Sequence, residues 1–128
     1  MMRLLLDTHV WIWYLTGASE LREDEREAMS LPENEVFLSP VSIWETLMLA
    51  EKGRLVLEPG PEEWVRRALD SYPTIEAPLN TEIAIMSRSI DLPHPDPADR
   101  FLAATAKVYE ASLVTHDRRL LESGVDTF

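Results

Sequence analysis

The sequence predicts an α/β fold in which a parallel sheet is wrapped by helices. Short apolar runs alternate along the chain with longer segments of helical periodicity. The first run, residues 2–6, is almost continuously apolar, as is typical of a central strand covered on both faces. With 128 residues and a hydrophobic share of 45%, the chain has the length and composition of one globular domain, which we expect to span residues 1–128.

The bounds of the elements follow from the residues that punctuate these runs. Pro40 and Pro61 suit the first turns of helices, and Gly17 and Gly53 suit helix ends. Thr8 is the expected cap of the first helix. We expect helices at residues 8–15, 20–30, 41–52, 61–69, 81–90 and 98–109 with a short one from residue 118, and four or five strands at residues 2–6, 36–39, 74–77, 112–115 and, for the fifth, 125–127.

Composition and charge exclude several classes of protein. The net charge of -11, from 23 acidic and 12 basic side chains, argues against a general binder of the nucleic-acid backbone. The absence of cysteine excludes disulfides and thiolate-bound zinc, and it fits a reducing compartment. The most apolar stretch, residues 4–15, is interrupted by Asp7 and His9, is too short to cross a membrane and does not form a secretory signal. We therefore expect a cytoplasmic protein without a membrane partner.

Four carboxylates occupy positions that share one edge of the predicted sheet. Asp7 follows the first strand and Asp117 follows the strand at residues 112–115. Asp99 begins an apolar helix, and Glu45 lies early in the helix after the second strand. In open parallel sheets, ligands bind beyond the carboxyl ends of the strands, where loops and helix N-termini converge. Acids that are far apart in sequence are therefore expected to meet there.

Helix capping is the ordinary explanation for each of these acids, because a carboxylate at a helix start satisfies free backbone N–H groups. Asp96-Pro97-Ala98-Asp99 fits a cap, a proline at the first position and an acid at the third. Ser42-Ile43-Trp44-Glu45 matches a capping box, and Asp117 could cap the helix from Arg118. Taken singly, each acid fits a cap better than a ligand.

The joint pattern nevertheless favours a site. Glu45 falls beyond the first turn if Ser39 already caps its helix, and Asp7 lies between an apolar strand and an apolar helix. A buried carboxylate is costly unless it is paired or coordinates a metal. We expect Asp7 and Asp99 to bind a divalent metal directly, whereas Glu45 and Asp117 would contact the metal through water molecules.

A cluster of oxygen ligands suits Mg²⁺ or Mn²⁺. Carboxylates brought together raise one another's pKa, and a divalent cation relieves their repulsion. Such a metal would hold a phosphate oxygen, lower the pKa of an attacking water and stabilise the leaving oxygen, as hydrolysis of a phosphodiester requires. No G-x-S-x-G motif, cysteine nucleophile or glycine-rich phosphate loop offers a competing chemistry.

Histidines and tryptophans near the acids have two readings each. The histidines could act as general acid and base or as zinc ligands, although structural hydrogen bonding is the favoured role for His9, His94 and His116. The tryptophans could stack on bases. Helical spacing and apolar neighbours favour core or dimer packing for Trp11, Trp13, Trp44 and Trp64.

Four motifs, in this order, match a known pattern: Leu6-Asp7-Thr8-His9, Ser42-Ile43-Trp44-Glu45, Asp96-Pro97-Ala98-Asp99-Arg100 followed by Leu102-Ala103-Ala104-Thr105-Ala106, and Thr115-His116-Asp117. With these motifs the chain resembles the PIN-domain nucleases, in particular the VapC-type toxins of bacterial and archaeal toxin–antitoxin pairs. The similarity spans nearly the whole chain. It implies a three-layer sandwich with a central parallel sheet, and an Mg²⁺- or Mn²⁺-dependent endoribonuclease that cuts RNA.

The resemblance also implies roles for single residues. The acidic quartet of the family maps to Asp7, Glu45, Asp99 and Asp117. Asp96 matches an additional acid of many relatives, as a metal ligand or only as a cap, and Thr115 matches a hydroxyl residue that often orients the last acid. The basic residues next to the acids are candidates for phosphate contacts, or else solvated surface: Arg100, Arg118 and Arg119, with Lys52 and Arg54 as weaker candidates.

The partners implied by the resemblance are a second copy, giving a homodimer, and a cognate antitoxin that inserts a segment near the active site. An acidic surface would attract a basic antitoxin segment. Phosphatases of the haloacid dehalogenase type fit worse because His9 stands where they need a second Asp, and receiver domains fit worse because no lysine follows Lys107. The alternative function is a non-catalytic PIN-like module that binds RNA or protein, against which the intact acids argue.

Overall fold

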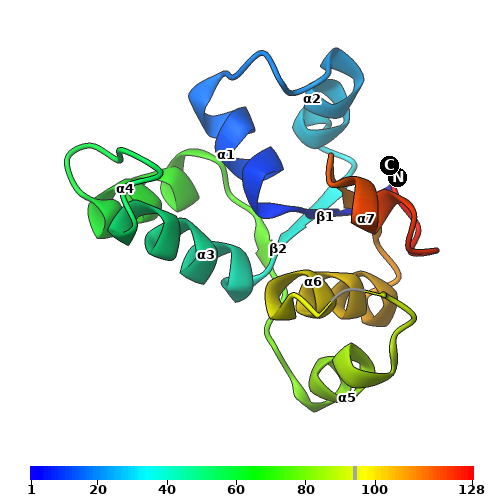
Figure 1. Cartoon of the computed structure of the whole chain (residues 1–128). Helices are drawn as coiled ribbons and strands as arrows, with labels where there is room; N and C mark the ends of the chain where they lie inside the picture. Colours follow the sequence, from blue (N-terminus) through cyan, green and yellow to red (C-terminus); the bar gives the residue numbers. More distant parts are fainter. Residues whose placement is uncertain (94) are drawn as a thin grey trace.

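A computed structural model describes residues 1–93 and 95–128. Its centre is a sheet with the strand order β3-β2-β1-β4 (Figure 1). The strands are β1 (Arg3–Leu6), β2 (Glu35–Leu38), β3 (Ile75–Glu76) and β4 (Ser112–Val114). All neighbouring strands are parallel, and Leu5 of β1 lies opposite Phe37 on one side and Leu113 on the other. The predicted α/β fold with a parallel sheet is confirmed.

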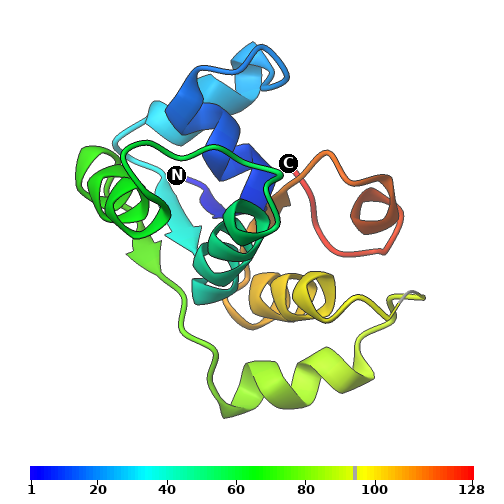
Figure 2. The ribbon, with the colours of Figure 1, turned by 60° about the vertical axis from the view of Figure 1, so that its left-hand side comes forward.

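Helices connect the strands and pack around the sheet (Figure 2). They are α1 (Thr8–Thr16), α2 (Glu23–Ser30), α3 (Pro40–Glu51), α4 (Pro61–Ser71), α5 (Thr81–Ser89), α6 (Pro97–Val108) and α7 (Arg118–Leu121). Within the described residues, none of them is long and apolar enough to cross a membrane.

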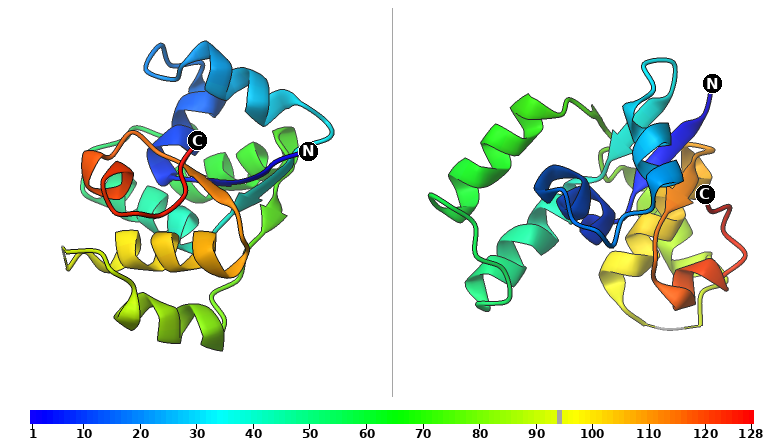
Figure 3. Two further views of the ribbon diagram at one scale, coloured as in Figure 1. Left: turned by 90° about the vertical axis from the view of Figure 1, so that its right-hand side faces the viewer. Right: turned by 90° about the horizontal axis from the view of Figure 1, so that it is seen from above.

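The sheet separates two apolar clusters, which gives the predicted layers. Side chains alternate across β1, so Leu4 and Leu6 join one cluster and Leu5 joins the other. The first cluster includes residues of α1, α2 and α4, and the second includes residues of α6 and α7. Figure 3 shows α1 and α2 on one side of the sheet and α5 and α6 on the other. Both faces of β1 are covered, which explains why its three buried residues, Leu4, Leu5 and Leu6, are all apolar.

Two helix starts bear on the site. Asp7, not Thr8, caps α1, because its carboxylate accepts a hydrogen bond from the Thr8 N–H at 2.7 Å. The expectation that Thr8 is the cap is therefore wrong, and Thr8 is the first helical residue. Ser39 caps α3 through a 3.1 Å bond from the Val41 N–H. Glu45 consequently lies beyond the first turn of α3, where capping does not explain it.

Two other details differ from expectation. In the part of the chain that the structure describes, the sheet has four strands, and the predicted fifth strand is reduced to an isolated bridge between Leu113 and Thr127. Among the tryptophans, Trp11 is fully buried, as expected for the core, whereas Trp44 is 58% exposed. Trp44 therefore does not belong to the core.

The parallel arrangement brings the carboxyl ends of β1, β2 and β4 to one edge of the sheet. The residues that follow these strands are Asp7, Ser39 and Thr115. α3 also contacts both α1 and α6, so that helices from distant parts of the sequence lie together at this edge. This edge carries the candidate site.

Candidate active site

Asp7 is a buried carboxylate at the end of β1, only 9% exposed. Its Oδ1 accepts from the Thr8 N–H, and its Oδ2 accepts from the Thr115 hydroxyl at 2.6 Å. Burial raises the pKa of Asp7 above its ordinary value, the bonds from Thr115 and Thr8 and the nearby His9 oppose that rise, and the charge of Asp117 adds to it. Asp7 is thus held in one orientation at the centre of the site.

Thr115 joins the ends of two strands. Besides donating to Asp7, its Oγ1 accepts a 3.0 Å hydrogen bond from the Asp117 N–H. The Asp117 carboxylate accepts from the Arg119 N–H at 2.9 Å and caps α7. One hydroxyl therefore ties the first acid of the predicted site to the main chain of the last acid.

Glu45 approaches the same edge from α3 and is half-buried. Its Oε1 lies 2.5 Å from the hydroxyl of Thr8, which also lies 3.0 Å from the Ser42 hydroxyl. Burial raises the pKa of Glu45, the bond from Thr8 lowers it, and the charge of Asp7 raises it further. The sequence reasoning missed this bridging role of Thr8, although Thr8 was already part of the quoted motif around Asp7.

Asp99 lies in the first turn of α6 and is buried. Burial and the charges of Asp96, Asp7 and Asp117 raise the pKa of Asp99 to about 7, and Arg119 lowers it in part. The carboxylate of Asp96 accepts from the N–H groups of Ala98 and Asp99 at 3.0 and 3.3 Å. The cap role of Asp96 is therefore confirmed, while its role as a metal ligand stays a prediction.

The predicted acids thus form one electrostatic cluster. The pKa of Asp7 is raised in part by Asp117, that of Glu45 by Asp7 and Asp96, and that of Asp99 by three of the other acids. The contacts agree with these shifts, because Thr115 links Asp7 to Asp117 and Arg119 lies within 3.6 Å of both Asp99 and Asp117. The acids that the sequence places far apart are therefore gathered at one edge of the sheet, as expected.

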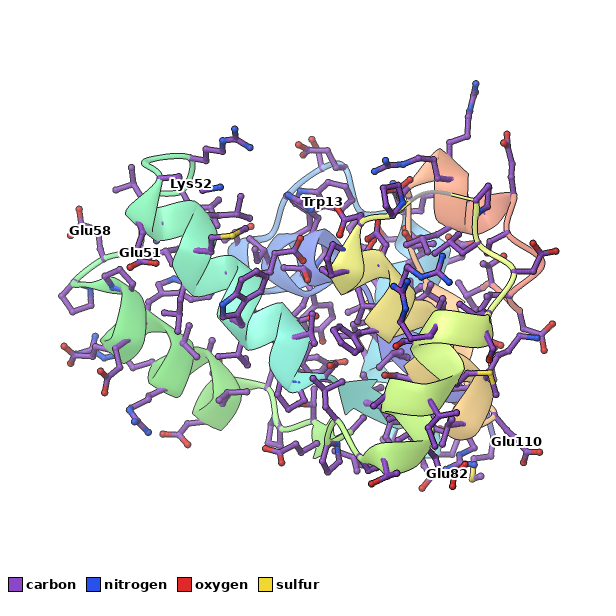
Figure 4. The ribbon with its side chains drawn as sticks, turned by 60° about the horizontal axis from the view of Figure 1, so that its bottom comes forward. Trp13, Glu51, Lys52, Glu58, Glu82 and Glu110 are labelled. Atoms are coloured by element: carbon purple, nitrogen blue, oxygen red, sulfur yellow. The ribbon has the colours of Figure 1, made fainter. Side chains whose placement is uncertain are left out.

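Arg119 is the basic side chain that reaches this cluster from α7. Its Nη2 lies 3.4 Å from Asp117 Oδ2 and 3.6 Å from Asp99 Oδ2. Arg118 is exposed beside it. Figure 4 shows Lys52 at the end of α3 far from α6, so this weaker candidate stands away from the acids. Phosphate contacts by the arginines stay predictions, with Arg119 the best placed.

Arg100 follows Asp99 in the sequence and was a candidate for phosphate contacts beside the acids, but its guanidinium binds main-chain carbonyls instead. Its guanidinium donates to the main-chain carbonyls of Ser87, Ile90 and Leu92 at 2.8, 3.1 and 2.6 Å. These bonds hold the end of α5 against α6. Adjacent helical residues do not face the same direction, which is why Asp99 and Arg100 diverge. The guanidinium of Arg100 is thus engaged within the fold, and its contact with phosphate stays a prediction.

The donor set fits a hard divalent cation in its chemistry. Carboxylate oxygens are the ligands that Mg²⁺ and Mn²⁺ prefer, and the crowding of negative charge favours a cation. Within the described residues, no group of three Asp, Glu or His side chains is already arranged as a metal-holding set. The fit therefore rests on donor chemistry and charge, with water in the remaining coordination positions, as Mg²⁺ commonly retains.

The described histidines lie beside aromatic rings and do not form a zinc-like set. The ring of His9, which is exposed, lies 6.0 Å from the ring of Trp13. The ring of His116 lies 5.0 Å from the same Trp13 ring, in an edge-on arrangement. Nε2 of His116 contacts the carboxylate of Glu25, which the sequence did not single out. His94 lies outside the described residues.

Comparison with known proteins decides the family. The sequence model of the PIN domain matches residues 4–124. The chain belongs to the PIN domain family. This PIN domain is 30% identical over 121 residues to Ribonuclease VapC22 of Mycobacterium tuberculosis, covering 94% of the chain and 91% of that protein.

Solved structures share the fold of this PIN domain. VapBC2 from Rickettsia felis, bound to a DNA fragment from its promoter, is similar with a TM-score of 0.68 and 14% identity, over 98% of this chain and 96% of that chain. A toxin-antitoxin complex from Klebsiella pneumoniae gives a TM-score of 0.66 and 19% identity over the same shares of the two chains. The three-layer arrangement expected from the resemblance is thus confirmed.

Replacing Thr115 with Val tests how the PIN domain holds its central acid. The variant keeps the side-chain shape but loses the bonds to Asp7 Oδ2 and from the Asp117 N–H. We expect the free energy of unfolding to fall by about 2 kcal/mol at neutral pH, because a buried acceptor and a donor lose their partner. Urea denaturation measures this loss. Thr115→Ser retains the hydroxyl and should lose much less, and equal stability of the Val variant and the wild type would contradict the account.

Proposed function

We propose that this PIN domain is an Mg²⁺- or Mn²⁺-dependent endoribonuclease and the toxin of a type II toxin–antitoxin pair. The observation that carries the proposal is the clustering of four acids at the carboxyl edge of the sheet. Thr115 links Asp7 to Asp117, Thr8 links Asp7 to Glu45, and Arg119 lies beside both Asp99 and Asp117. Its relative VapC22 is named a ribonuclease, which supports RNA as the substrate.

The roles of the chain's own residues follow from their environments. Asp7 and Asp99 would hold the metal directly, and Glu45 and Asp117 would hold it through water. When bound, the cation would polarise a phosphodiester and lower the pKa of an attacking water. Thr115 keeps one oxygen of Asp7 oriented by its hydrogen bond. Arg119, exposed beside two of the acids, would contact a phosphate of the RNA.

A partner protein is supported by charge and by an exposed apolar surface. The net charge of -11 favours a basic segment of an antitoxin. Trp44, Leu47 and Leu69 line a hollow between α3 and α4, and Trp44 is exposed there. A solved relative of the same fold is a toxin-antitoxin complex. Homodimer formation and a cytoplasmic location stay predictions.

The test is cleavage of a cellular RNA pool by the purified protein with Mg²⁺ or Mn²⁺, with a chelator, and with excess Mn²⁺ added back. We expect cleavage that the chelator abolishes and the added metal restores, because the carboxylates need the cation to act. Cleavage that persists in chelator would exclude the metal mechanism. Metal and RNA binding without cleavage would instead favour the non-catalytic binding module.

A further inference from the structure

Glu25 is a buried carboxylate that the proposed site does not include. It lies on α2, whose sequence EDEREAMS predicts a solvated helix, yet its side chain is completely buried. Ala28 and Met29 already anchor α2 in the apolar cluster on this face of the sheet. Burying a carboxylate is costly unless its partners compensate. One partner is local, because Glu25 accepts from the Arg22 N–H in a capping box at the start of α2.

The partners of Glu25 connect α2 to the segment that follows β4. Oε1 and Oε2 lie 2.8 and 2.9 Å from Nε2 of His116. Oε1 also accepts from the Arg22 N–H at 2.9 Å, and Nη1 of Arg22 lies 3.4 Å from Oε2. The ring of Trp13 packs edge-on against His116. The imidazole is therefore fixed by a carboxylate within the fold and by an aromatic ring.

His116 lies in the sequence between Thr115 and Asp117, two residues of the candidate site. Thr115 donates to Asp7, and the Asp117 N–H donates back to Thr115. Because a side chain held at one residue restricts the main chain on both sides of it, fixing His116 restrains both neighbours. In Figure 1 the segment that precedes α7 lies next to α2, consistent with this contact.

We propose that Glu25 is a positioning residue for the site, which holds His116 so that Thr115 and Asp117 keep the arrangement that binds the cation. The inference rests on the proposed metal-dependent function. Groups that orient metal-binding residues by hydrogen bonds contribute strongly to metal affinity, although they do not touch the metal. Glu25 does not contact these metal-binding residues, and it would act on them indirectly, through the main chain around His116.

Glu25→Met removes the carboxylate and retains an unbranched side chain. We expect the dissociation constant for Mn²⁺, measured by titration calorimetry, to rise about 10-fold. Glu25→Gln keeps one acceptor oxygen and should lose less affinity than Glu25→Met. Met29→Ala is the matched control, because it destabilises the same helix by opening a cavity without touching His116, and its Mn²⁺ affinity should be unchanged.

Hydrogen exchange in the metal-free protein gives a second readout. The amide of Asp117 should exchange several-fold faster in Glu25→Met but not in Met29→Ala, because only the former releases the segment. In a His116→Ala background, Glu25→Met should cause no further loss of Mn²⁺ affinity, as a double-mutant cycle requires of residues that act together.

The outcomes separate the inference from the function it rests on. If the wild type binds Mn²⁺ and Glu25→Met binds it equally well with unchanged exchange at Asp117, the positioning role is overturned. Failure of the wild type to bind Mn²⁺ would contradict the proposed function, and exchange at Asp117 would still decide whether Glu25 holds the segment. Should Glu25→Met not fold, Glu25→Gln carries the same comparison with the Met29→Ala control.

Discussion

Asp7→Asn is expected to reduce RNA cleavage by about 1000-fold while the protein stays folded. Asn keeps the shape of the side chain and can still accept from the Thr8 N–H, as Asp7 does at 2.7 Å. It lacks the negative charge with which a carboxylate attracts and binds a divalent cation. The loss should therefore appear in the rate of cleavage at saturating RNA and in the affinity for Mn²⁺.

The control for Asp7→Asn is Asp70→Asn, which makes the same chemical change at an exposed position of α4. Its rate should equal that of the wild type. Both proteins are purified identically and assayed on one RNA pool, so that a contaminating nuclease would act in each. Equal cleavage by Asp7→Asn and wild type would contradict the role given to Asp7.

Asp99→Asn is expected to stabilise the metal-free protein by about 2 kcal/mol at about pH 8, while it removes cleavage. Burial and neighbouring acids raise the pKa of Asp99 from 3.8 to about 7. The carboxyl group of Asp99 therefore binds its proton more tightly in the folded protein than in the unfolded chain. The neutral amide avoids both the cost of burying the charge and the repulsion of Asp96, Asp7 and Asp117.

The direction of the pH dependence follows from the same shift. Between pH 3.8 and about 7 the unfolded chain has fewer protons bound at Asp99 than the folded protein. Protonation of Asp99 therefore stabilises the folded protein fully below pH 3.8. This stabilisation decreases as the pH rises from 3.8 to about 7, and it is absent at higher pH. Urea denaturation across the window, with chelator, should show that the advantage of Asp99→Asn grows with pH.

Metal should reverse this order of stability. Mn²⁺ stabilises only a folded protein that binds it, so saturating Mn²⁺ should raise the melting temperature of the wild type and leave that of Asp99→Asn unchanged. If the stability difference between Asp99→Asn and the wild type did not change with pH, the pKa of Asp99 would not be raised in the folded protein.

Local patterns were sufficient for most of the fold. The apolar run of β1 and the prolines and glycines at helix ends predicted the elements in the right order, because these signals depend on near neighbours. The fifth strand was less well predicted, since the pairing of Thr127 with Leu113 is limited to an isolated bridge. The length of a strand at a sheet edge depends on its partner, which a local pattern does not contain.

Side-chain direction explains the residues that were placed incorrectly. Asp99 and Arg100 are adjacent in sequence, but Asp99 belongs to the acid cluster and Arg100 binds the carbonyls at the end of α5. Glu25 looks like its exposed neighbours on α2, yet it is buried against His116, which lies 91 residues away. Nothing in either local sequence specifies these partners.

The sequence by itself determined the parallel α/β architecture, the order of the strands along the chain and the carboxylates that follow them. It did so because apolar periodicity and the strand-end rule act over short distances and apply to any open parallel sheet. Only the tertiary structure decided which oxygen of Asp7 is held by Thr115, that Thr8 bridges to Glu45, and that Glu25 supports His116. These contacts join segments brought together by the packing of helices on the sheet, so their geometry exists only in the folded chain.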